Sequence, residues 1–414
     1  MIAIVGAGLA GLSCAQELQR QGREFVLFEA ADEPGGRVRS EVLDGFVLDR
    51  GFQVILSSYP AVSDAVHIPS LRPRFFAQGA LIWSGGRLSR LESPLASPGS
   101  LLSGITTRVF SFSDKARLAL VLARLLVTPD RAFLSECRSP HDVSVANWVA
   151  ARGFSPEFST RFLQPFFGGV LLDNDLGTSA GLFRYYLKKF ATGRAWIPAA
   201  GIAAFPRAMA DSLPRGAIRF GKRVCAIDVR GDRAAGLVFQ DGTKFAATSI
   251  VLALDEPSLA KLAGCEARPG RAVTVVYFKS PKPLYHGAFL VLPEGKTRLV
   301  RHFAQVTNVA PELAPAGWHL ISASVLEHSH RDDLADAAAR EINEIFPDAT
   351  LSHLATIRVP YAVPTQSPGF AGRVKFPTFP KNVHCAGDWA TGASIQSALE
   401  SGKFAAAFRQ DSQD

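Results

Sequence analysis

Three glycines near the start of the chain have the spacing of a phosphate-binding turn. Gly6, Gly8 and Gly11 follow an apolar stretch, residues 2–5, that predicts a buried strand, and they open a helical segment. In this pattern the first glycine permits a tight turn, the second lets a pyrophosphate approach the backbone, and the third lets helix and strand pack closely. The anion would lie at the helix N-terminus, where free N–H groups and the helix dipole favour negative charge.

Glu29 supplies the second chemical group of this unit. It closes another predicted strand, residues 24–28, where a carboxylate can accept hydrogen bonds from both hydroxyls of an adenosine ribose. An unphosphorylated ribose is therefore expected, and NADP is disfavoured. Strand, glycine turn, helix and acid together predict a Rossmann-like dinucleotide-binding unit, because each piece has the required place in the order.

A second glycine pair follows the acid and ends in a basic residue, Gly35-Gly36-Arg37. Arg37 can make a charge-assisted contact to a diphosphate that the first turn already holds. Without this context the same arginine would be interpreted as an ordinary surface residue after a turn.

With these residues in order, the chain resembles the superfamily of FAD-dependent amine oxidases, phytoene desaturases and protoporphyrinogen oxidases. The resemblance continues along nearly the whole length. Residues 46–53 resemble the segment that reaches the flavin after the glycine pair, and residues 162–170 resemble a substrate-domain motif of the desaturase and protoporphyrinogen oxidase branches. Val224, after the stretch 196–202, matches the position whose backbone holds the adenine.

Two stretches near the end, residues 384–389 and 394–402, resemble the closing FAD motif of that superfamily. The resemblance implies that Asp388 holds the ribitol chain and that a helix beginning near Ser394 points its N-terminus at the flavin pyrimidine. The residues support this independently, because Gly387 allows close approach to a ligand and Ser394 can cap a helix over residues 395–408. A helix N-terminus would stabilise the negative charge of a reduced flavin.

The motifs and the resemblance together imply FAD as the cofactor. The residues expected to bind it are Gly6, Gly8, Leu9, Ala10, Gly11, Glu29, Ala30, Gly35, Gly36, Arg37, Gly51, Phe52, Gln53, Val224, Gly387, Asp388, Ser394, Ile395 and Gln396.

The cysteines and histidines predict neither a metal site nor a redox disulfide. The five cysteines show no CxxC spacing, and the nine histidines are scattered without metal-ligand spacing. All five thiols are expected to be buried. Cys385 precedes the closing turn, but covalently flavinylated members of the superfamily carry their cysteine elsewhere in the motif, so non-covalent FAD is expected.

The alternation of patterns predicts two domains and an α/β fold. A discontinuous Rossmann-like FAD-binding domain is expected from residues 1–55, 194–265 and 376–414, and an inserted α+β substrate domain from residues 56–193 and 266–375. Within the second, residues 60–190 are expected to be mainly helical. Antiparallel strands are expected over 272–278, 286–292 and 318–325, with a helix over 332–345, and residues 93–104 predict a loop near the substrate entrance.

Composition and charge limit the partners and the cellular location that we expect for the protein. The 414 residues are 47% hydrophobic with a net charge of +8, but basic residues with interleaved aromatics do not cluster, so nucleic acid is not an expected partner. No apolar run reaches the roughly 18 residues of a membrane span, and the N-terminus lacks a signal-peptide layout. A cytoplasmic protein, as a monomer or homodimer, is expected.

The basic, apolar region 101–134 leaves two interpretations open. It could be an amphipathic helix pair that touches a membrane surface, or an internal helix pair of the substrate domain with a solvated basic edge.

The substrate side of the site is expected to be aromatic and poor in charge. Many amine-oxidising relatives carry a lysine near the flavin on the strand that here spans 272–278, yet this strand contains none, and Lys279 follows it. Amine oxidation is therefore in doubt, and the desaturase-like side is favoured. Aromatic surface for the pocket is expected from Phe162, Phe166, Phe167, Phe183, Tyr185, Tyr186, Tyr361 and Trp389. The leading candidates for contact with the substrate are Tyr361, Trp389, Phe167 and Tyr185.

The expected function is hydride transfer from a largely apolar small molecule to flavin, by a dehydrogenase, desaturase or oxidase, with oxygen or a quinone as oxidant. One alternative is an amine or amino-acid oxidase. Another is a non-catalytic isoprenoid-binding escort protein of the same fold, against which Glu29 and Asp388 argue. A flavin-containing NAD dehydrogenase is disfavoured, because the chain lacks a second GxGxxG motif that would hold a nicotinamide nucleotide beside the flavin.

Overall fold

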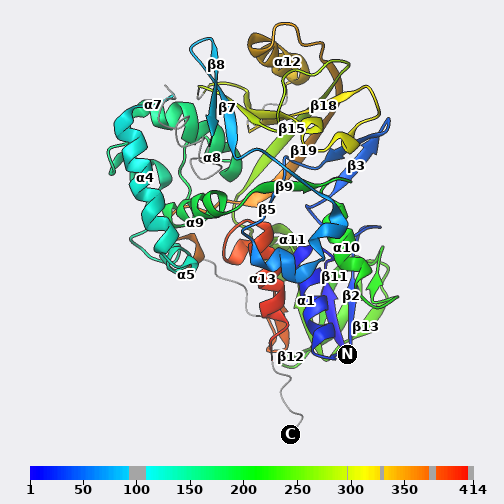
Figure 1. The fold of residues 1–414 in the computed structure, drawn as a ribbon. Helices are drawn as coiled ribbons and strands as arrows, with labels where there is room; N and C mark the ends of the chain where they lie inside the picture. The colour runs from blue at the N-terminus through cyan, green and yellow to red at the C-terminus, as the bar shows by residue number, and fades with distance from the viewer. Residues whose placement is uncertain (93–108, 296, 327–330, 373–378, 409–414) are drawn as a thin grey trace.

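A computed structural model of the chain describes residues 1–92, 109–295, 297–326, 331–372 and 379–408. In Figure 1 one sheet with its helices forms the lower part of the molecule, a second sheet forms the upper part, and a group of helices lies to the left. The predicted loop 93–104 and the first part of the region 101–134 lie outside the described residues.

A five-stranded parallel sheet organises the lower part. Its strand order is β10-β2-β1-β14-β20. The strands are β1 (Ile2–Val5), β2 (Phe25–Phe28), β10 (Ile218–Arg219), β14 (Ser249–Leu252) and β20 (Val383–Cys385). The strands lie within the three segments expected to form the FAD-binding domain, and β1 occupies the centre with all its residues buried. This is the Rossmann-like α/β arrangement that the sequence predicted.

Two helices from opposite ends of the chain pack together on this sheet. They are α1 (Leu9–Arg20) and α13 (Ile395–Ala405), coloured blue and red in Figure 1. A Cβ atom on Gly402 would lie 2.0 Å from the carbonyl oxygen of Ala10, so the two helices approach to backbone contact there. This contact joins the first turn of α1 to the C-terminal part of α13.

A small antiparallel sheet covers the outer side of β2. It consists of β11 (Val224–Arg230), β12 (Arg233–Phe239) and β13 (Lys244–Ala246), and the turn between β12 and β13 contains Gly242, where φ is +80°. The ring of Phe28 lies 4.9 Å from the rings of both Phe239 and Phe245. These aromatic contacts hold β12 and β13 against β2, and β11, which carries Val224, pairs with β12.

The upper part is a seven-stranded sheet in the order β19-β15-β18-β17-β16-β7-β8. Its strands are β7 (Gly79–Ser84), β8 (Arg87–Glu92), β15 (Gly270–Ser280), β16 (Leu290–Pro293), β17 (Val300–Gln305), β18 (His319–Val325) and β19 (Ser352–Pro364). The helix α12 (Leu334–Ile345) packs on it through Ala338 and Ile342.

The expectation that residues 60–190 are mainly helical is wrong for its first part. The strands β7 and β8 form a hairpin there, because Gly85 and Gly86 both adopt positive φ, at 57° and 72°, as a two-residue hairpin turn of the primed type requires.

Apart from the short helix α2 (Pro60–Ala65), the α-helices described in this region lie after residue 109. They are α4 (Phe112–Val127), α5 (Asp130–Glu136), α6 (Val145–Ala150), α7 (Pro156–Phe158), α8 (Gln164–Leu171) and α9 (Ala180–Thr192). A cluster of aromatic side chains, including Trp148, Phe158, Phe167 and Phe183, holds them together.

Short elements connect the two sheets. They are β3 (Ser40–Leu43), β4 (Phe46–Asp49), β5 (Ile55–Leu56), α2 (Pro60–Ala65), β6 (Pro73–Phe75), β9 (Ala195–Pro198), α10 (Ala204–Asp211) and α11 (Glu256–Ala263).

Cys14 and Cys137 are buried, but Cys225 and Cys265 are exposed, so the prediction that every thiol is buried is wrong: Cys225 lies on the open side of β11. Among the described residues, no helix has both the length and the apolar character needed to cross a bilayer.

Candidate flavin and substrate site

A cavity of about 1470 Å³ extends from the ends of β1 and β2 to the helices α4, α8 and α9. Single small-molecule pockets usually measure about 300–1000 Å³. One end of this cavity, here called the dinucleotide end, is lined by Gly6, Gly8 and Glu29, and the other, here called the apolar end, includes Phe166 and Phe190. The cavity therefore has room for a dinucleotide and a second molecule.

The three glycines of the first turn have different surroundings, as the pattern predicted. Gly6 has a φ of +100°, which a residue with a side chain rarely adopts. A Cβ atom on Gly11 would lie 1.9 Å from the carbonyl oxygen of Gly6, so only glycine permits this packing of helix on strand. A Cβ atom on Gly8 would meet no atom within 4 Å, because Gly8 faces the cavity. The structure thus leaves room for a ligand beside Gly8, at the start of α1.

Glu29 lies at the end of β2 and lines the cavity. Its carboxylate accepts hydrogen bonds from the N–H groups of Ala7, at 2.7 Å, and Ala31, at 2.9 Å. These bonds hold the carboxylate at the glycine turn. Since each carboxylate oxygen can accept more than one hydrogen bond, acceptor capacity remains for ribose hydroxyls.

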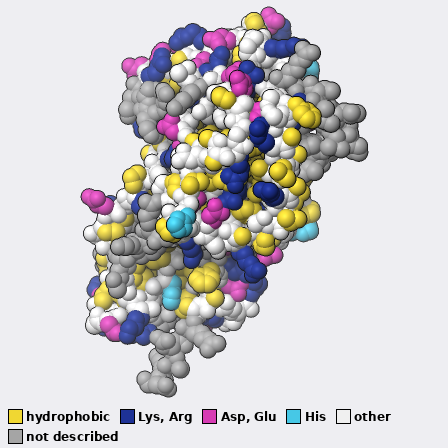
Figure 2. Space-filling model, turned by 90° about the vertical axis from the view of Figure 1, so that its left-hand side faces the viewer, with side chains coloured by type: hydrophobic (Ala, Val, Ile, Leu, Met, Phe, Trp, Pro, Cys, Tyr) yellow, Lys and Arg dark blue, Asp and Glu magenta, His cyan; other side chains and the backbone are white. Residues whose placement is uncertain are grey.

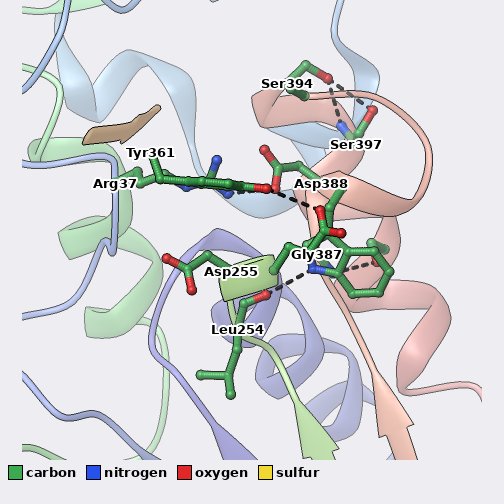
Figure 3. A network of polar contacts seen from close by, with 12 residues as sticks. Arg37, Leu254, Asp255, Tyr361, Gly387, Asp388, Ser394 and Ser397 are labelled. Carbon is green, nitrogen blue, oxygen red and sulfur yellow. Dashed lines mark hydrogen bonds and ion pairs between the residues drawn. The ribbon is translucent and has the colours of Figure 1, made fainter. Parts of the chain in front are cut away.

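Arg37 and Asp388 converge from distant parts of the chain and form an ion pair with 2.6 Å between Nη2 and Oδ1. Figure 3 shows the two side chains pointing toward one another. Arg37 also donates a hydrogen bond to the carbonyl oxygen of Ala362 at 2.9 Å. Burial lowers the pKa of Arg37, but the Asp388 carboxylate outweighs this and raises the pKa, so the guanidinium stays charged. Both residues line the cavity. From the sequence, Arg37 is expected to contact the diphosphate and Asp388 to hold the ribitol chain.

The N-terminus of α13 meets the cavity through Ser394 and Ile395. The Ser394 hydroxyl accepts a hydrogen bond from the Ser397 N–H at 3.1 Å, so the predicted cap is confirmed. Figure 3 shows this cap near Asp388. Just before it, Gly387 also lines the cavity.

Most of the residues expected to bind FAD surround the dinucleotide end. Those that line the cavity are Gly6, Gly8, Leu9, Ala10, Glu29, Ala30, Gly35, Gly36, Arg37, Gly51, Phe52, Gln53, Val224, Gly387, Asp388, Ser394 and Ile395. Gly11 and Gln396 are not part of the lining. Gly11 packs against Gly6, whereas the Gln396 side chain turns away to accept a hydrogen bond from the Ala61 N–H.

Of the four aromatic candidates for the substrate pocket, Phe167 lines the cavity, and Tyr361, Trp389 and Tyr185 do not. The Tyr361 hydroxyl donates to Glu256 at 3.1 Å, and the Trp389 indole donates to the Leu254 carbonyl oxygen at 3.0 Å. Both rings are therefore held away from the cavity.

Tyr185 points into the helical core, and its neighbour Tyr186 takes the cavity side of α9. The Tyr186 hydroxyl donates to the carbonyl oxygen of Ala393 at 3.0 Å. Successive residues of an α-helix point in directions about 100° apart, so one position decides which tyrosine reaches the cavity.

The strand in which amine-oxidising relatives carry a lysine contributes Val273 to the lining. Lys279, at the end of the same strand, does not reach the cavity, and its ammonium group lies 5.4 Å from the centre of the Trp318 ring. No lysine of this strand therefore lines the cavity.

Two polar residues of the cavity wall, His302 and Ser324, are absent from the sequence-based candidates. Both are buried, at 5% and 1% exposure, and both lie in strands whose central residues are buried without alternation. The signal in the sequence is a histidine within a buried strand, and it was missed because His302 has no metal-ligand spacing to another histidine or cysteine.

The fold and the cavity are those of an FAD-dependent oxidoreductase, with a cradle for a dinucleotide joined to a chamber for a second molecule. Comparison with known families identifies the family of oxidoreductases. Residues 9–407 match the model of the flavin containing amine oxidoreductases, and the chain belongs to that family. A flavin is therefore its cofactor.

Individual relatives are more distant. The chain is 31% identical to the zeta-carotene desaturase of Zea mays over 176 residues, 40% of this chain and 31% of that protein. It is 26% identical to the phytoene dehydrogenase of Streptomyces griseus over 353 residues, 78% of this chain and 68% of that protein. The match thus spans only about a third of the maize enzyme's length. A crystal structure of an oxidoreductase from Methanosarcina mazei has the same fold, with a TM-score of 0.73, 18% identity, and coverage of 97% and 98% of the two chains.

Proposed function

We propose that the protein binds FAD non-covalently and dehydrogenates a largely apolar small molecule. The observation that carries this proposal is the continuity of the cavity: the dinucleotide end and the apolar end are parts of one space. The similarity to carotenoid desaturases supports the same class of substrate.

The surroundings of the dinucleotide end fit FAD. Glu29, the open face of Gly8 and the Arg37–Asp388 pair match the ribose, the diphosphate and the ribitol of that cofactor in order. Among the described lining residues the one cysteine is Cys225, next to Val224 at the adenosine end. Burial raises the pKa of the Cys385 thiol to about 12, which disfavours the nucleophilic thiolate there. Both facts favour non-covalent binding.

The apolar end would bind and orient the substrate. Bound flavin would supply the hydride acceptor. The chain supplies a wall of aromatic rings that excludes water and packs against an apolar molecule, namely Phe110, Phe162, Phe166, Phe167 and Phe190. No lysine of β15 reaches this space, which ranks amine oxidation second. The presence of Glu29 and Asp388 in the lining ranks the escort protein third.

The test is an anaerobic screen of purified protein against carotenoid precursors, porphyrinogens and amines. We expect flavin absorption bands that denaturation releases from the protein, and bleaching of these bands by an apolar substrate. Bleaching by amines alone, with release of hydrogen peroxide in air, would establish the amine oxidase instead. A colourless protein that takes up no flavin would support the escort role.

A second proposal concerns a membrane surface, and it rests on the exposed face of α4. Phe112 and Val127 are 76% and 82% exposed, and the alanines and leucines between them on the same face are also exposed. Figure 2 shows hydrophobic side chains gathered with basic ones across this side of the molecule. The same helix lines the cavity through Leu118 and Leu122, so an apolar substrate could pass from a bilayer into the cavity along α4.

Sedimentation with vesicles that contain phosphatidylglycerol tests the membrane proposal. We expect the double variant Phe112→Ser, Val127→Ser to bind about tenfold more weakly, because it removes large apolar groups from the contact. The matched control is Phe404→Ser, on α13, where the side chain is 83% exposed. Equal loss in both variants, or no loss in either, would assign the face of α4 to plain solvation.

A further inference from the structure

The cavity wall formed by the middle of the seven-stranded sheet contains an unusual pair of polar residues. The strands β15, β16, β17 and β18 present Val273, Leu290, His302 and Ser324 to the cavity. His302 and Ser324 face each other across neighbouring strands, as partners in the antiparallel register. They place adjacent polar side chains in an otherwise apolar part of the wall.

Neither member of the pair has its hydrogen bonds fulfilled. Both ring nitrogens of His302 and the hydroxyl of Ser324 are buried and have no hydrogen-bond partner among the described residues. Buried polar groups in native proteins are nearly always hydrogen-bonded, and the exceptions commonly mark a place where a ligand or water completes the bond. The pair therefore offers free hydrogen-bonding capacity to whatever occupies the cavity.

The surroundings hold the His302 ring in place. Phe52 packs edge-on against it with 5.1 Å between ring centres. On the other side, a Cβ atom on Gly169 would lie 2.3 Å from Nδ1, so glycine is needed for the ring to fit. A bulge between Val300 and His302 interrupts the strand pairing beside it. A ring held this way, without hydrogen bonds of its own, is positioned by packing.

The chemistry of the pair selects the kind of group that it can bind. Burial and the nearby Arg301 charge lower the pKa of His302 to about 4, so the imidazole is neutral at physiological pH. A neutral imidazole has one donor and one acceptor, and a serine hydroxyl can do both. Such a pair suits a neutral oxygen, because neither of the two side chains carries a charge that would compensate a carboxylate or an ammonium group for its lost hydration.

We propose that His302 and Ser324 form a polar subsite that hydrogen-bonds a hydroxyl or carbonyl oxygen on the otherwise apolar substrate. This proposal rests on the proposed function, because it assumes that the apolar end receives the substrate. It narrows the substrate class to oxygen-bearing apolar molecules, as opposed to pure hydrocarbons.

The test measures how the flavin-loaded protein distinguishes geraniol from 2,6-dimethyl-2,6-octadiene, which lacks the hydroxyl. Binding is followed by displacement of a fluorescent apolar dye, and the preference is the ratio of the two dissociation constants. We expect the preference for geraniol to fall about fivefold to tenfold in His302→Phe and in Ser324→Ala, as loss of a net hydrogen bond predicts. Ser324→Thr, which keeps a hydroxyl, should retain most of it.

The matched control is Ser322→Ala, on the same strand, whose hydroxyl does not line the large cavity. It should leave the preference unchanged, and unchanged binding of the diene in every variant would show that the cavity is intact. Equal preferences in the wild type, His302→Phe and Ser324→Ala, or no binding of geraniol, would overturn the subsite.

Flavin absorption separates the two proposals. A protein that takes up no flavin refutes the proposed function, whereas a yellow protein without the expected change in preference refutes only the subsite. A shift of the flavin bands in His302→Phe with an unchanged preference would also overturn it, because His302 would then contact the cofactor.

Discussion

The two ends of the cavity are built from different materials. At the dinucleotide end the backbone forms much of the surface, with glycines where a ligand or a neighbouring chain must come close and with helix N-termini that supply N–H groups. At the apolar end the surface is made mostly of aromatic side chains. They belong to helices whose other side chains form the core of the helical part of the molecule. The dinucleotide end thus depends on glycines, which have no side chain, whereas the apolar end depends on which aromatic side chains face the cavity.

Gly11→Ala should have the largest effect. The added methyl group would overlap the carbonyl oxygen of Gly6, 1.9 Å away, and backbone atoms on both sides leave little freedom to move. We expect a loss of more than about 4 kcal/mol in the free energy of unfolding, or insoluble protein. Thermal unfolding monitored by circular dichroism measures it. A melting temperature close to that of the wild type would show that the helix is not packed as described.

Gly8→Val tests the same turn where it faces the cavity. A Cβ atom there meets nothing within 4 Å, so the fold should survive while the valine occupies space expected for the diphosphate. We expect flavin affinity to fall at least a hundredfold, about 3 kcal/mol. Flavin titration followed by fluorescence quenching measures this. A folded variant that binds flavin normally would refute the close approach at Gly8.

His302→Phe tests the wall of the apolar end through pH. In the folded protein the pKa of His302 falls from 6.5 to about 4 through burial and the Arg301 charge, so the unfolded chain binds more protons between these values. Stability supplied by the neutral ring is therefore present above pH 6.5 and is lost as pH falls toward 4, by roughly 3 kcal/mol in total.

The phenylalanine variant should lack this loss, so its stability relative to wild type should rise as pH falls. Urea unfolding at several pH values between 4 and 7.5 provides the measurement. Burial raises the pKa of Asp49 to about 6, so the stability that its protonated form contributes is lost as pH rises. This contribution is the same in both proteins and cancels in the comparison. Parallel curves for the two proteins would contradict the buried, neutral state of His302.

Glu29→Ala should weaken flavin retention by about 2 kcal/mol, roughly thirtyfold, because it removes a charged acceptor for the ribose. The change also leaves the N–H groups of Ala7 and Ala31 without their carboxylate. Glu29→Gln is the matched control, since it keeps an acceptor oxygen at the same position and should lose less. Full flavin occupancy of the alanine variant after extensive dialysis would exclude the ribose role.

Ser394→Ala should have the smallest effect. It removes the hydroxyl that accepts from Ser397 N–H at the start of α13, a cap worth about 1 kcal/mol of stability. Ser394→Asp keeps an acceptor and should restore most of it. Chemical denaturation compares the three proteins. An alanine variant as stable as the wild type would mean that another group replaces the cap.

The contrast between the two ends explains what the sequence could predict. The turn at Gly6, the packing at Gly11 and the cap at Ser394 depend on local backbone conformation, which few residue types allow, and their positions were predicted. Phe167 was placed in the lining, but Tyr361, Trp389 and Tyr185 turn to other partners. An aromatic residue can fill a core or a cavity equally well, so its type does not state its direction.

The missed features depend on residues that are distant in sequence. His302 gains its significance from Phe52, Gly169 and Ser324, which come from other elements, so its local sequence carries little information about its role. The hairpin of β7 and β8 was missed for a different reason. Gly85 and Gly86 are a local hairpin signal, but the surrounding region was assigned as a whole by its helical character.

The central position of β1 has a consequence for biosynthesis. Its register partners are Phe25 on one side and Ser249 on the other, and the sheet is complete only when Val383 has paired with Ile250. At translation rates of about 5–20 residues per second, roughly 20–80 s separate the first strand from the last. The free edge of β14 therefore stays unpaired until the last part of the chain has been synthesised, and the sheet that positions Gly6 and Glu29 is complete only then.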